Sequence, residues 1–372
     1  MSQQRPGVTF VIDDLGYGGT QRQLHLQARA LSGRIAMRVA SLSAQVEPYA
    51  ARLREQGIDV AVLPRRSSLD AGRVRALVDY LRAGDHGIVH GMLEASNAYA
   101  FVAARTLRLP LVLSLRNSIL TVTGAKAAAL QWMYRHADAV TVNSVAGRET
   151  LVGPVGVAPD RVHLVPNIVP VPASRPALDP APGPLLGAIG RLTDQKRFHA
   201  VIEALPAVRR VFPGARLEIL GEGPLHDELE AGARRHGVED AVELAGVVAD
   251  PAPRMTRYAC LVIASAHEGV PNVALEALAI GLPVVGVPVG DIPRLVSDGV
   301  TGVMARDGSP AALAEAITTA LSSPSLRATA LGAGPALVRE HYSEAAARDR
   351  LLGVYDALRD GGKKTPGAIT GG

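Results

Sequence analysis

Short apolar runs alternate with amphipathic segments along most of this chain, and this alternation limits the folds that it can adopt. In the first half, the apolar runs 8–12 and 111–115 are followed by segments with helical periodicity, such as 21–31. Strands that are apolar throughout and separated by helices are typical of a parallel sheet buried on both faces. The pattern therefore predicts an α/β fold built on a Rossmann-like unit.

A proline-rich segment interrupts the alternation near the middle of the chain. Seven prolines lie between residues 166 and 184. Because proline fixes φ and lacks an N–H group, such a segment suits neither a helix nor a central strand, and it predicts an extended linker at 171–184. The alternation then restarts at residues 185–189. We therefore expect a second Rossmann-like domain, and a cleft between the two domains as the place for a ligand.

The length agrees with this division, since 372 residues are long for one domain and suit two of about 150–180 residues. The expected parts are an N-terminal domain at 1–170, a C-terminal domain at 185–342, a last helix within 343–360 that can return to the first domain, and a disordered tail at 361–372.

Cysteine and apolar content set the expected location of the protein. The single cysteine, Cys260, cannot form an internal disulfide and fits a reducing compartment. The first apolar run is too short for a signal peptide, and no run approaches the roughly 18–20 apolar residues of a membrane span. We expect a cytoplasmic protein, with peripheral contact at the inner face of a membrane left open.

Charge is unevenly distributed along the chain. Residues 1–175 contain 20 Lys and Arg against 12 Asp and Glu, a balance of +8, whereas the remainder has a balance of −4. The excess of positive charge in the first half has two equally open interpretations: this half binds an anionic partner, or it has a basic surface that contacts only solvent. Nucleic acid is disfavoured because no basic stretch is interleaved with aromatic residues. The candidates for contact with an anionic membrane are Arg52, Arg54, Arg65, Arg66, Arg73 and Arg75.

Three loops of the second half carry residues suited to a phosphorylated ligand. Arg191 and Lys196 follow the run 185–189, and a guanidinium and an ammonium on one loop suit a diphosphate, although such a loop can also be merely solvated. Gly221 and Gly246 each follow another strand-like run. A glycine there allows either a close ligand approach or a tight turn.

The most specific feature follows the apolar run 260–264. Glu268 lies on the loop after this run, and Pro271 is placed to begin a helix. Glu276 lies about one turn into that helix, where it lines the same pocket or merely favours the helix dipole. The start of the helix offers an anion site through the backbone N–H groups of Asn272, Val273 and Ala274.

The spacing of the two glutamates resembles a known family. Glu268 and Glu276, with seven residues between them, match the E-x7-E signature of glycosyltransferase family 4, a retaining family with the GT-B fold. Further matches, in consistent order, are Gly190-Arg191-Leu192 with Lys196, residues 221–224, 281–285 and 298–302, Asn143-Ser144 and Val165-Pro166-Asn167. The resemblance implies two Rossmann-like domains facing each other across a cleft, the first for the acceptor and the second for a nucleotide-sugar donor.

The resemblance also implies roles for single residues. Arg191 and Lys196 would hold the donor diphosphate and stabilise the leaving nucleoside diphosphate without a metal or another cofactor. Glu268 would contact the transferred sugar and Glu276 the donor ribose. The other implied donor-binding positions are Gly18, Gly19, Gly221, Gly246, Pro271, Asn272 and Val273. The implied partners are a nucleotide diphosphate sugar, with UDP as the default, and a glycan, glycolipid or lipid-linked acceptor. Retention by same-face attack is favoured, and double displacement through Glu268 is the rival.

The sequence departs from the family at two places, and a histidine near one of them has two interpretations. Many members carry a histidine at the end of the strand that resembles 111–115, where this chain has Arg116 followed by Asn117. Either Arg116 replaces a donor contact or the acceptor chemistry differs. His90, after another strand, is either a second cleft residue or structural. The loop around Gly290 lacks the family's paired glycines, which implies a different donor-sugar specificity.

Two other functions fit parts of the pattern. A nucleotide-sugar epimerase or a phosphorylase can share the fold, but epimerases show other acidic and histidine patterns, and phosphorylases are much longer and need a pyridoxal lysine. A non-catalytic nucleotide-sugar-binding protein would not need the cations and carboxylates that are intact here. The resemblance therefore implies a retaining, metal-independent glycosyltransferase of the hexosyltransferase type.

Overall fold

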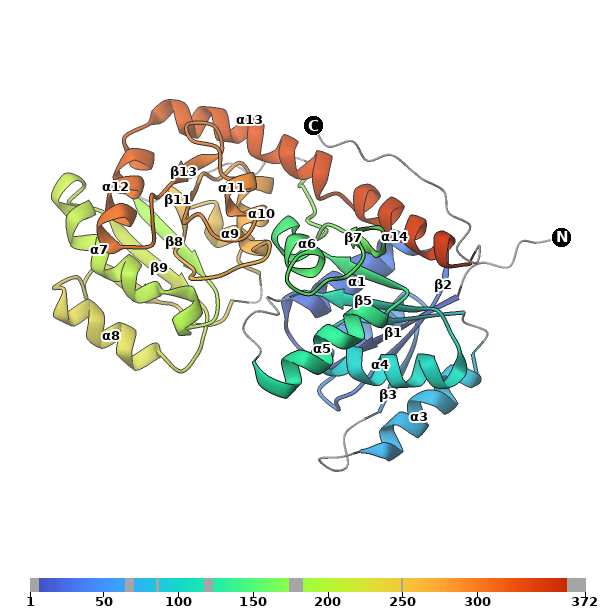
Figure 1. Cartoon of the computed structure of the whole chain (residues 1–372). Coiled ribbons are helices and arrows are strands. Elements are labelled where there is room, and N and C mark those ends of the chain that lie inside the picture. The colour runs from blue at the N-terminus through green and yellow to red at the C-terminus, as the bar shows by residue number, and fades with distance from the viewer. Residues whose placement is uncertain are drawn as a thin grey trace. The chain divides into compact units, whose positions relative to one another are not determined.

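The computed structural model describes residues 7–63, 70–84, 87–116, 123–173, 183–248 and 250–359. The chain forms two compact units, whose elements are labelled in Figure 1. The first unit runs to Ile168 and takes up the chain again at Glu344, and the second unit runs from Val169 to Ser343. The units divide just ahead of the predicted linker at 171–184, most of which lies outside the described residues.

The first unit is built on a parallel sheet of seven strands in the order β3-β2-β1-β4-β5-β6-β7. The strands are β1 (Gly7–Ile12), β2 (Ala36–Ser41), β3 (Asp59–Val62), β4 (Ile88–Gly91), β5 (Leu111–Leu115), β6 (Ala139–Val142) and β7 (Val162–Leu164). Strands β1, β4, β5 and β6 are buried along their whole length, as expected for a sheet covered on both faces. This order, with its reversal at β1, is that of a Rossmann-like unit and confirms the predicted class.

Helices cover both faces of this sheet. They are α1 (Gly19–Leu31), α2 (Tyr49–Glu55), α3 (Ala71–Arg82), α4 (Glu94–Leu107), α5 (Gly124–His136), α6 (Val145–Val152), the 3-10 helix η2 (Pro159–Arg161) and α14 (Glu344–Arg359). On β1, Val11 packs with residues of α3, α4 and α5, whereas Val8, Phe10 and Ile12 pack with residues of α1, α2 and α14. This division follows from the two-residue period of a strand, which sends successive side chains to opposite faces.

The last helix, α14, belongs to the first unit although it follows the second unit in the chain. It lies beside α1 (Figure 1) and contributes Leu351, Val354 and Tyr355 to the core on that face. Arg29 of α1 forms an ion pair with Glu344 at the start of α14. Burial of this apolar face is what ties the helix to the first unit, because burying several aliphatic and aromatic side chains outweighs one exposed ion pair.

The second unit has a parallel sheet of six strands in the order β10-β9-β8-β11-β12-β13. The strands are β8 (Leu185–Ile189), β9 (Arg216–Leu220), β10 (Val242–Leu244), β11 (Cys260–Ile263), β12 (Val284–Gly286) and β13 (Gly302–Met304). The helices are η3 (Asp194–Lys196), α7 (Phe198–Val211), α8 (His226–Arg235), α9 (Ala252–Met255), α10 (Asn272–Ala279), α11 (Ile292–Leu295), α12 (Pro310–Leu321) and α13 (Pro324–His341). This is a second Rossmann-like unit, as predicted.

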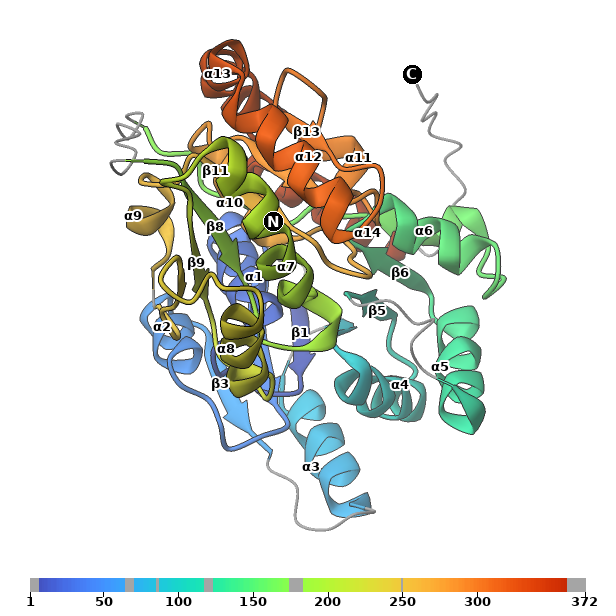
Figure 2. The same ribbon diagram turned by 90° about the vertical axis from the view of Figure 1, so that its left-hand side faces the viewer.

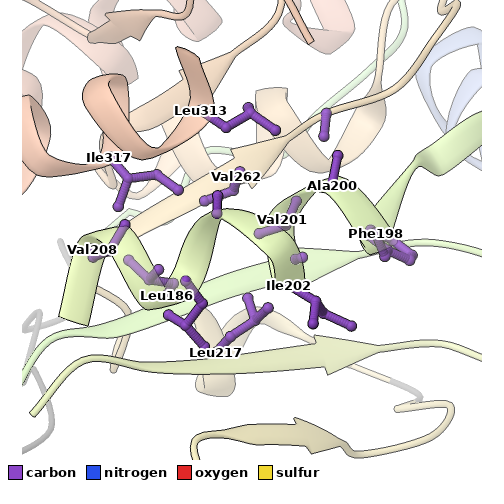
Figure 3. Close-up of a cluster of buried hydrophobic side chains, with 14 of the residues drawn as sticks. Leu186, Phe198, Ala200, Val201, Ile202, Val208, Leu217, Val262, Leu313 and Ile317 are labelled. Carbon is purple, nitrogen blue, oxygen red and sulfur yellow. The ribbon is translucent and has the colours of Figure 1, made fainter. Parts of the chain in front are cut away.

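Small aliphatic side chains fill the two cores of the second unit. On one face α7 and α12 lie side by side (Figure 2), and Val201, Leu313 and Val262 come together between these helices and the sheet (Figure 3). On the other face, residues of α9, α10, α11 and α13 pack against Leu261 and Val284. Side chains of this size let helices lie close to the sheet, which suits a chain with only 3% aromatic residues.

The sequence pattern did not predict β7, β13, α6, α9, α11 or α13. Both strands have three residues, which is too short for a period to be visible. Helix α13 has 18 residues but includes Gly332, Gly334 and Pro335, which weaken a helical pattern. Its contact with α10 explains one of them: a Cβ on Gly334 would lie 2.6 Å from the Leu278 carbonyl oxygen, so glycine allows the two helices to approach.

The arginines predicted to contact a membrane differ in their exposure. Arg52, Arg54 and Arg75 are exposed. Arg73 is only 7% exposed and its guanidinium lies 5.0 Å from the centre of the Tyr99 ring, so its assignment as a membrane contact was wrong. The remaining two candidates, Arg65 and Arg66, lie outside the described residues.

Candidate active site

The loops that follow the strands of the second unit are joined to one another by backbone hydrogen bonds. The Gly190 N–H donates to the Leu220 carbonyl (2.9 Å), and the Gly221 N–H donates to the Gly246 carbonyl (2.8 Å). Parallel strands place all their carboxyl ends at one edge of the sheet, which is where α/β sheets bind ligands. Three of the predicted donor-binding loops therefore lie next to one another along this edge.

Lys196 and Glu268, both predicted to be catalytic, form an ion pair at the same edge. The Lys196 Nζ lies 2.6 Å from the Glu268 Oε1, and the two side chains are 20% and 9% exposed. Lys196 ends the 3-10 helix η3, whereas Glu268 lies on the loop after β11, 72 residues further along the chain. A charge-assisted bond this short and this shielded fixes both side chains, so the site presents a neutralised pair of defined geometry.

Gln195 holds the two loops that carry this pair. Its carbonyl accepts a hydrogen bond from the Ala266 N–H (2.8 Å), and its side-chain amide donates to the His267 carbonyl (3.0 Å). Gln195, next to Lys196, thus forms two hydrogen bonds with Ala266 and His267, the two residues that precede Glu268. This role could not be predicted, because a glutamine beside a lysine is common and its significance depends on the loop that it contacts.

Replacing Gln195 with alanine is expected to lower kcat by about tenfold, because the loops keep their backbone bond but lose the side-chain bond that aligns Lys196 with Glu268. The free energy of unfolding should fall by only about 1 kcal/mol. Steady-state release of nucleoside diphosphate, the activity that the family resemblance implies, measures the first quantity, and urea denaturation measures the second. Asp194→Ala, at an exposed position of the same turn, is the matched control. An equal loss of kcat in both variants, or none in Gln195→Ala, contradicts this role.

Two glycines allow the loops of this edge to approach closely. Gly221 has a φ of +144°, and a Cβ there would lie 2.8 Å from the Gly190 carbonyl carbon. Gly290 has a φ of +53°, and a Cβ there would lie 2.6 Å from the carbonyl oxygen of Gly269, which also accepts the Asp291 N–H (3.0 Å). The structure thus gives Gly290 a packing role beside the loop of Glu268.

The start of α10 only partly matches the predicted anion site. Pro271 occupies the N-cap with an extended backbone, as its sequence position indicated. The Ala274 N–H, however, donates to the Pro271 carbonyl (3.1 Å), so its assignment as a free group was wrong. The carbonyl of the N-cap residue Pro271 accepts this N–H within the first turn of the helix, so the N–H is not available to a ligand. Asn272, Val273 and Glu276 are half-buried on the same helix.

Arg191 completes the cationic part of this edge. Its side chain is exposed on the loop between β8 and η3, and within the described residues its guanidinium makes no hydrogen bond or ion pair. Five N–H donors of Arg191 are therefore open to a ligand, on the same loop as Lys196. An open guanidinium of this kind suits a phosphate group.

In the first unit, the glycine-rich loop ahead of α1 has a defined shape. Gly18 is the N-cap of α1 and Gly19 is its first residue, and both are exposed. The Asp14 carboxylate accepts hydrogen bonds from the Gly16 N–H and from the Gln21 side-chain amide, each at 2.9 Å. The loop is thus held from within, and the amide end of α1 is left without a side-chain cap.

His90 lies in the interior of the first unit. It is fully buried, with Nδ1 hydrogen-bonded to the Tyr355 hydroxyl (2.8 Å) and Nε2 to the Ser114 hydroxyl (2.9 Å). Burial lowers the pKa of His90 to about 3, so the ring is neutral at physiological pH. Of the two interpretations that the sequence left open, the structure supports the structural one and not a cleft residue: His90 links the sheet to α14.

Replacing Tyr355 with phenylalanine is expected to lower the free energy of unfolding of the first unit by about 1–3 kcal/mol, because the His90 Nδ1 loses its partner in a site that water cannot reach. Chemical denaturation followed by circular dichroism measures the change. Tyr17→Phe, at a position that is 73% exposed, should leave stability unchanged. If both variants are as stable as the wild type, His90 does not hold α14.

Arg116 is the last described residue before a gap, and Asn117 lies outside the described residues. Arg116 is half-buried, and its Nη1 donates to the Asn167 Oδ1 (3.1 Å). The same oxygen accepts the side-chain amide of Asn143 (3.3 Å). Asn143 and Asn167 matched family motifs in the sequence, and the Asn167 side-chain oxygen joins Arg116 to Asn143.

A surface pocket of about 580 Å³ lies at the other edge of the first sheet, where β5, β6 and β7 begin. Arg105 and Arg161 line it, but Arg105 pairs with Asp138 (2.9 Å), and both arginines donate to backbone carbonyls at the end of α5. Cations at a helix carboxyl end neutralise its dipole. These arginines therefore have a structural role, and the pocket adds nothing to the site.

Metal ligands and membrane-spanning helices were sought in the described part of the chain. There, no three His, Cys, Asp or Glu side chains are grouped as ligands of a metal ion would be. None of the described helices combines the length and the apolar character needed to cross a bilayer. Cys260 is buried, and burial raises the pKa of its thiol to about 12, so this side chain is part of the core.

The two Rossmann-like units define the class of fold. A crystal structure of Anabaena Alr3699/HepE in complex with UDP and glucose matches with a TM-score of 0.81 at 20% identity, over 94% of this chain and 99% of that one. Sucrose-phosphate synthase from Thermosynechococcus elongatus matches with a TM-score of 0.77 at 18% identity, over 96% and 100%. The chain has the GT-B fold of glycosyltransferases.

The family follows from the sequence matches. Residues 17–171 match the model of glycosyltransferase family 4, and residues 183–323 match that of glycosyl transferases group 1. Glycogen synthase of Mycobacterium tuberculosis is 32% identical over 204 residues, 53% of this chain and 49% of that protein. D-inositol 3-phosphate glycosyltransferase 1 of Catenulispora acidiphila is 29% identical over 345 residues, 83% and 80%. The matched region spans about half the length of several relatives, glycogen synthase among them. The chain belongs to glycosyltransferase family 4, as its E-x7-E pattern predicted.

Proposed function

We propose that this protein transfers a sugar from a nucleotide diphosphate donor, with UDP as the default nucleotide, to a glycan, glycolipid or lipid-linked acceptor. The anomeric configuration is retained and no metal ion takes part. The observation that carries this proposal is the Lys196–Glu268 pair (2.6 Å) at the carboxyl edge of the second sheet, with the exposed Arg191 on the same loop as Lys196.

The charges at this edge suit departure of a nucleoside diphosphate. Negative charge grows on the diphosphate as the bond to the sugar breaks, and Arg191 and Lys196 can stabilise it where a metal ion acts in other enzymes. Glu268 keeps Lys196 in place and lies near the position of the sugar, whose transition state carries positive charge. The Lys196–Glu268 pair thus acts on both groups that separate: Lys196 on the diphosphate and Glu268 on the sugar.

The state of Glu268 supports same-face attack. A carboxylate bound to an ammonium is a weaker nucleophile than a free one, because its charge is already shared in a short hydrogen bond. A double displacement would require Glu268 to leave Lys196 and bond to the sugar. Attack by the acceptor on the face that the diphosphate leaves, with a phosphate oxygen taking the proton, needs no such change.

Relatives and structural neighbours support the choice of donor and acceptor. The Anabaena protein has been crystallised with UDP, with UDP and glucose, and with UDP-glucose. A relative from Rhizobium meliloti, 33% identical over 183 residues, is a lipopolysaccharide core glycosyltransferase. An acceptor held at a membrane would suit the exposed Arg52, Arg54 and Arg75, and flotation with anionic vesicles at low and high salt tests that contact.

Release of nucleoside diphosphate from UDP-, GDP- and ADP-sugars, with EDTA present, tests the function. Hydrolysis of one donor that survives EDTA and is lost in Glu268→Ala identifies the donor and supports transfer without a metal. Activity that EDTA abolishes contradicts the metal-free mechanism. If a donor is bound but none is consumed, with or without candidate acceptors, the chain is a non-catalytic nucleotide-sugar-binding protein. If no donor is bound, the proposed function is wrong.

A further inference from the structure

Arg116 is a partly buried cation at the carboxyl edge of the first sheet, the edge at which sheets of this type bind ligands. Burial lowers the pKa of Arg116 to about 10, so it remains protonated at neutral pH. The Arg116 guanidinium is therefore partly desolvated and still positively charged.

The partners of Arg116 do not balance its charge. Within the described residues its guanidinium bonds only to the neutral Asn167 amide (3.1 Å), which uses one of five N–H donors. The carboxylates that follow β1 are engaged elsewhere, Asp13 with the Ser96 N–H (2.6 Å) and Asp14 with Gly16 and Gln21. Residues 117–122, which follow Arg116 in the chain, contain no Asp or Glu.

Two other arginines with structural roles in this chain are balanced by a carboxylate. Arg105 pairs with Asp138 (2.9 Å), and Arg254 pairs with Glu218 (2.6 Å). A partly buried cation without an anion costs free energy, whereas a bound anion would turn this cost into a charge-assisted contact. Asn143 and Asn167 supply only orientation, since both are neutral and buried. An orienting frame around an unbalanced guanidinium is the arrangement expected for a site that receives its anion from a ligand.

We propose that Arg116 binds an anionic group of the substrate, a carboxylate or a phosphate, and so selects for an acidic sugar or a phosphorylated acceptor. This inference rests on the proposed function, since it names a substrate class for the same enzyme. The guanidinium fork recognises both groups in the same way, so the two sources are separated by experiment.

Arg116→Met, which keeps the stem and removes the charge, is compared with the wild type on two matched pairs of substrates. UDP-glucuronate and UDP-glucose test an acidic donor sugar, and glucose 6-phosphate and glucose test a phosphorylated acceptor. We expect kcat/KM to fall by about 30–100-fold for the anionic member of one pair, mainly through KM, and by less than about threefold for its neutral partner. Arg116→Lys should recover part of the loss. The affected pair identifies the source of the anion.

The controls separate this proposal from the proposed function. Arg108→Met, an exposed arginine at the other edge of the same sheet, should change neither pair. UDP binding, measured by calorimetry, should persist in Arg116→Met and weaken in Arg191→Met. Glucuronate and glucose 6-phosphate binding is measured in the same way, so that the anion site is tested even if no donor is consumed. Equal losses for charged and neutral substrates, or anion binding unchanged in Arg116→Met, would overturn the proposal.

Discussion

Lys196→Met is expected to lower kcat for the donor by about 10²–10³-fold, with a smaller change in UDP affinity, because the ammonium acts on charge that develops as the diphosphate leaves. Methionine keeps the methylene stem, which lies against Gly190, and removes only the charge that pairs with Glu268. Single-turnover release of nucleoside diphosphate at saturating donor measures the effect, since it reports the chemical step rather than product release.

The matched control removes another ion pair of the same unit. Arg209 at the end of α7 pairs with Asp240 (3.2 Å) outside the strand-end loops, and Arg209→Met should leave kcat unchanged. Glu268→Gln should show a loss similar to that of Lys196→Met, and the double variant should lose less than the product of the two single effects, because the two side chains act as one unit. Fully multiplicative losses would show that the pair has no joint role.

Glu218→Ala is expected to have the largest effect on stability. Glu218 lies in the middle of β9 and is 2% exposed, and it accepts hydrogen bonds from the Tyr258 hydroxyl and from the Arg254 guanidinium (2.6 Å). Alanine would leave the buried Tyr258 hydroxyl without an acceptor, whereas Arg254, which is 37% exposed, can turn to water. We expect the free energy of unfolding to fall by about 3 kcal/mol and Tm by about 6–12 °C.

Thermal and urea unfolding of the full chain test this prediction, with the transition of the second unit as the readout, because two units can unfold separately. Glu218→Gln, which keeps the volume and removes the charge, should lose about half as much. Glu243→Ala, at an exposed position on the neighbouring strand β10, is the control and should change stability by less than about 0.5 kcal/mol. An unchanged Tm in Glu218→Ala would mean that this polar cluster contributes nothing net.

The periodic parts of the fold could be predicted from the sequence, and the aperiodic parts could not. Strand β5 was placed at 111–115, where the structure has it, because its apolar run is long enough to show burial on both sides. Helix α13 was missed because its Gly334 and Pro335 weaken the helical pattern. Glycine is needed at position 334 because the backbone of α10, which is distant in the sequence, lies against it. The sequence pattern does not show which residues are packed against the backbone of a distant segment.

The candidate site shows the same limit. Glu268 stood out through the E-x7-E spacing and Lys196 through its place after Gly190-Arg191-Leu192, yet nothing in the sequence placed the two side chains 2.6 Å apart. Gln195 was invisible, since its role depends on the carbonyl of His267 on another loop. His90 was ambiguous, because a histidine after a strand can face either solvent or the interior, and only its burial decides.

The sequence by itself determined the class of fold, the family and the residue types available for diphosphate chemistry, because these depend on local periodicity and on short spacings along the chain. The tertiary structure alone decided which charges are neutralised and which are left open. Lys196 pairs with Glu268, His90 is hydrogen-bonded to Tyr355 and Ser114, and among the described residues the Arg116 guanidinium bonds to a single amide, that of Asn167. The physical reason is that the free energy of a charge depends on what surrounds it in space, and in a parallel sheet those surroundings come from loops that are distant in sequence.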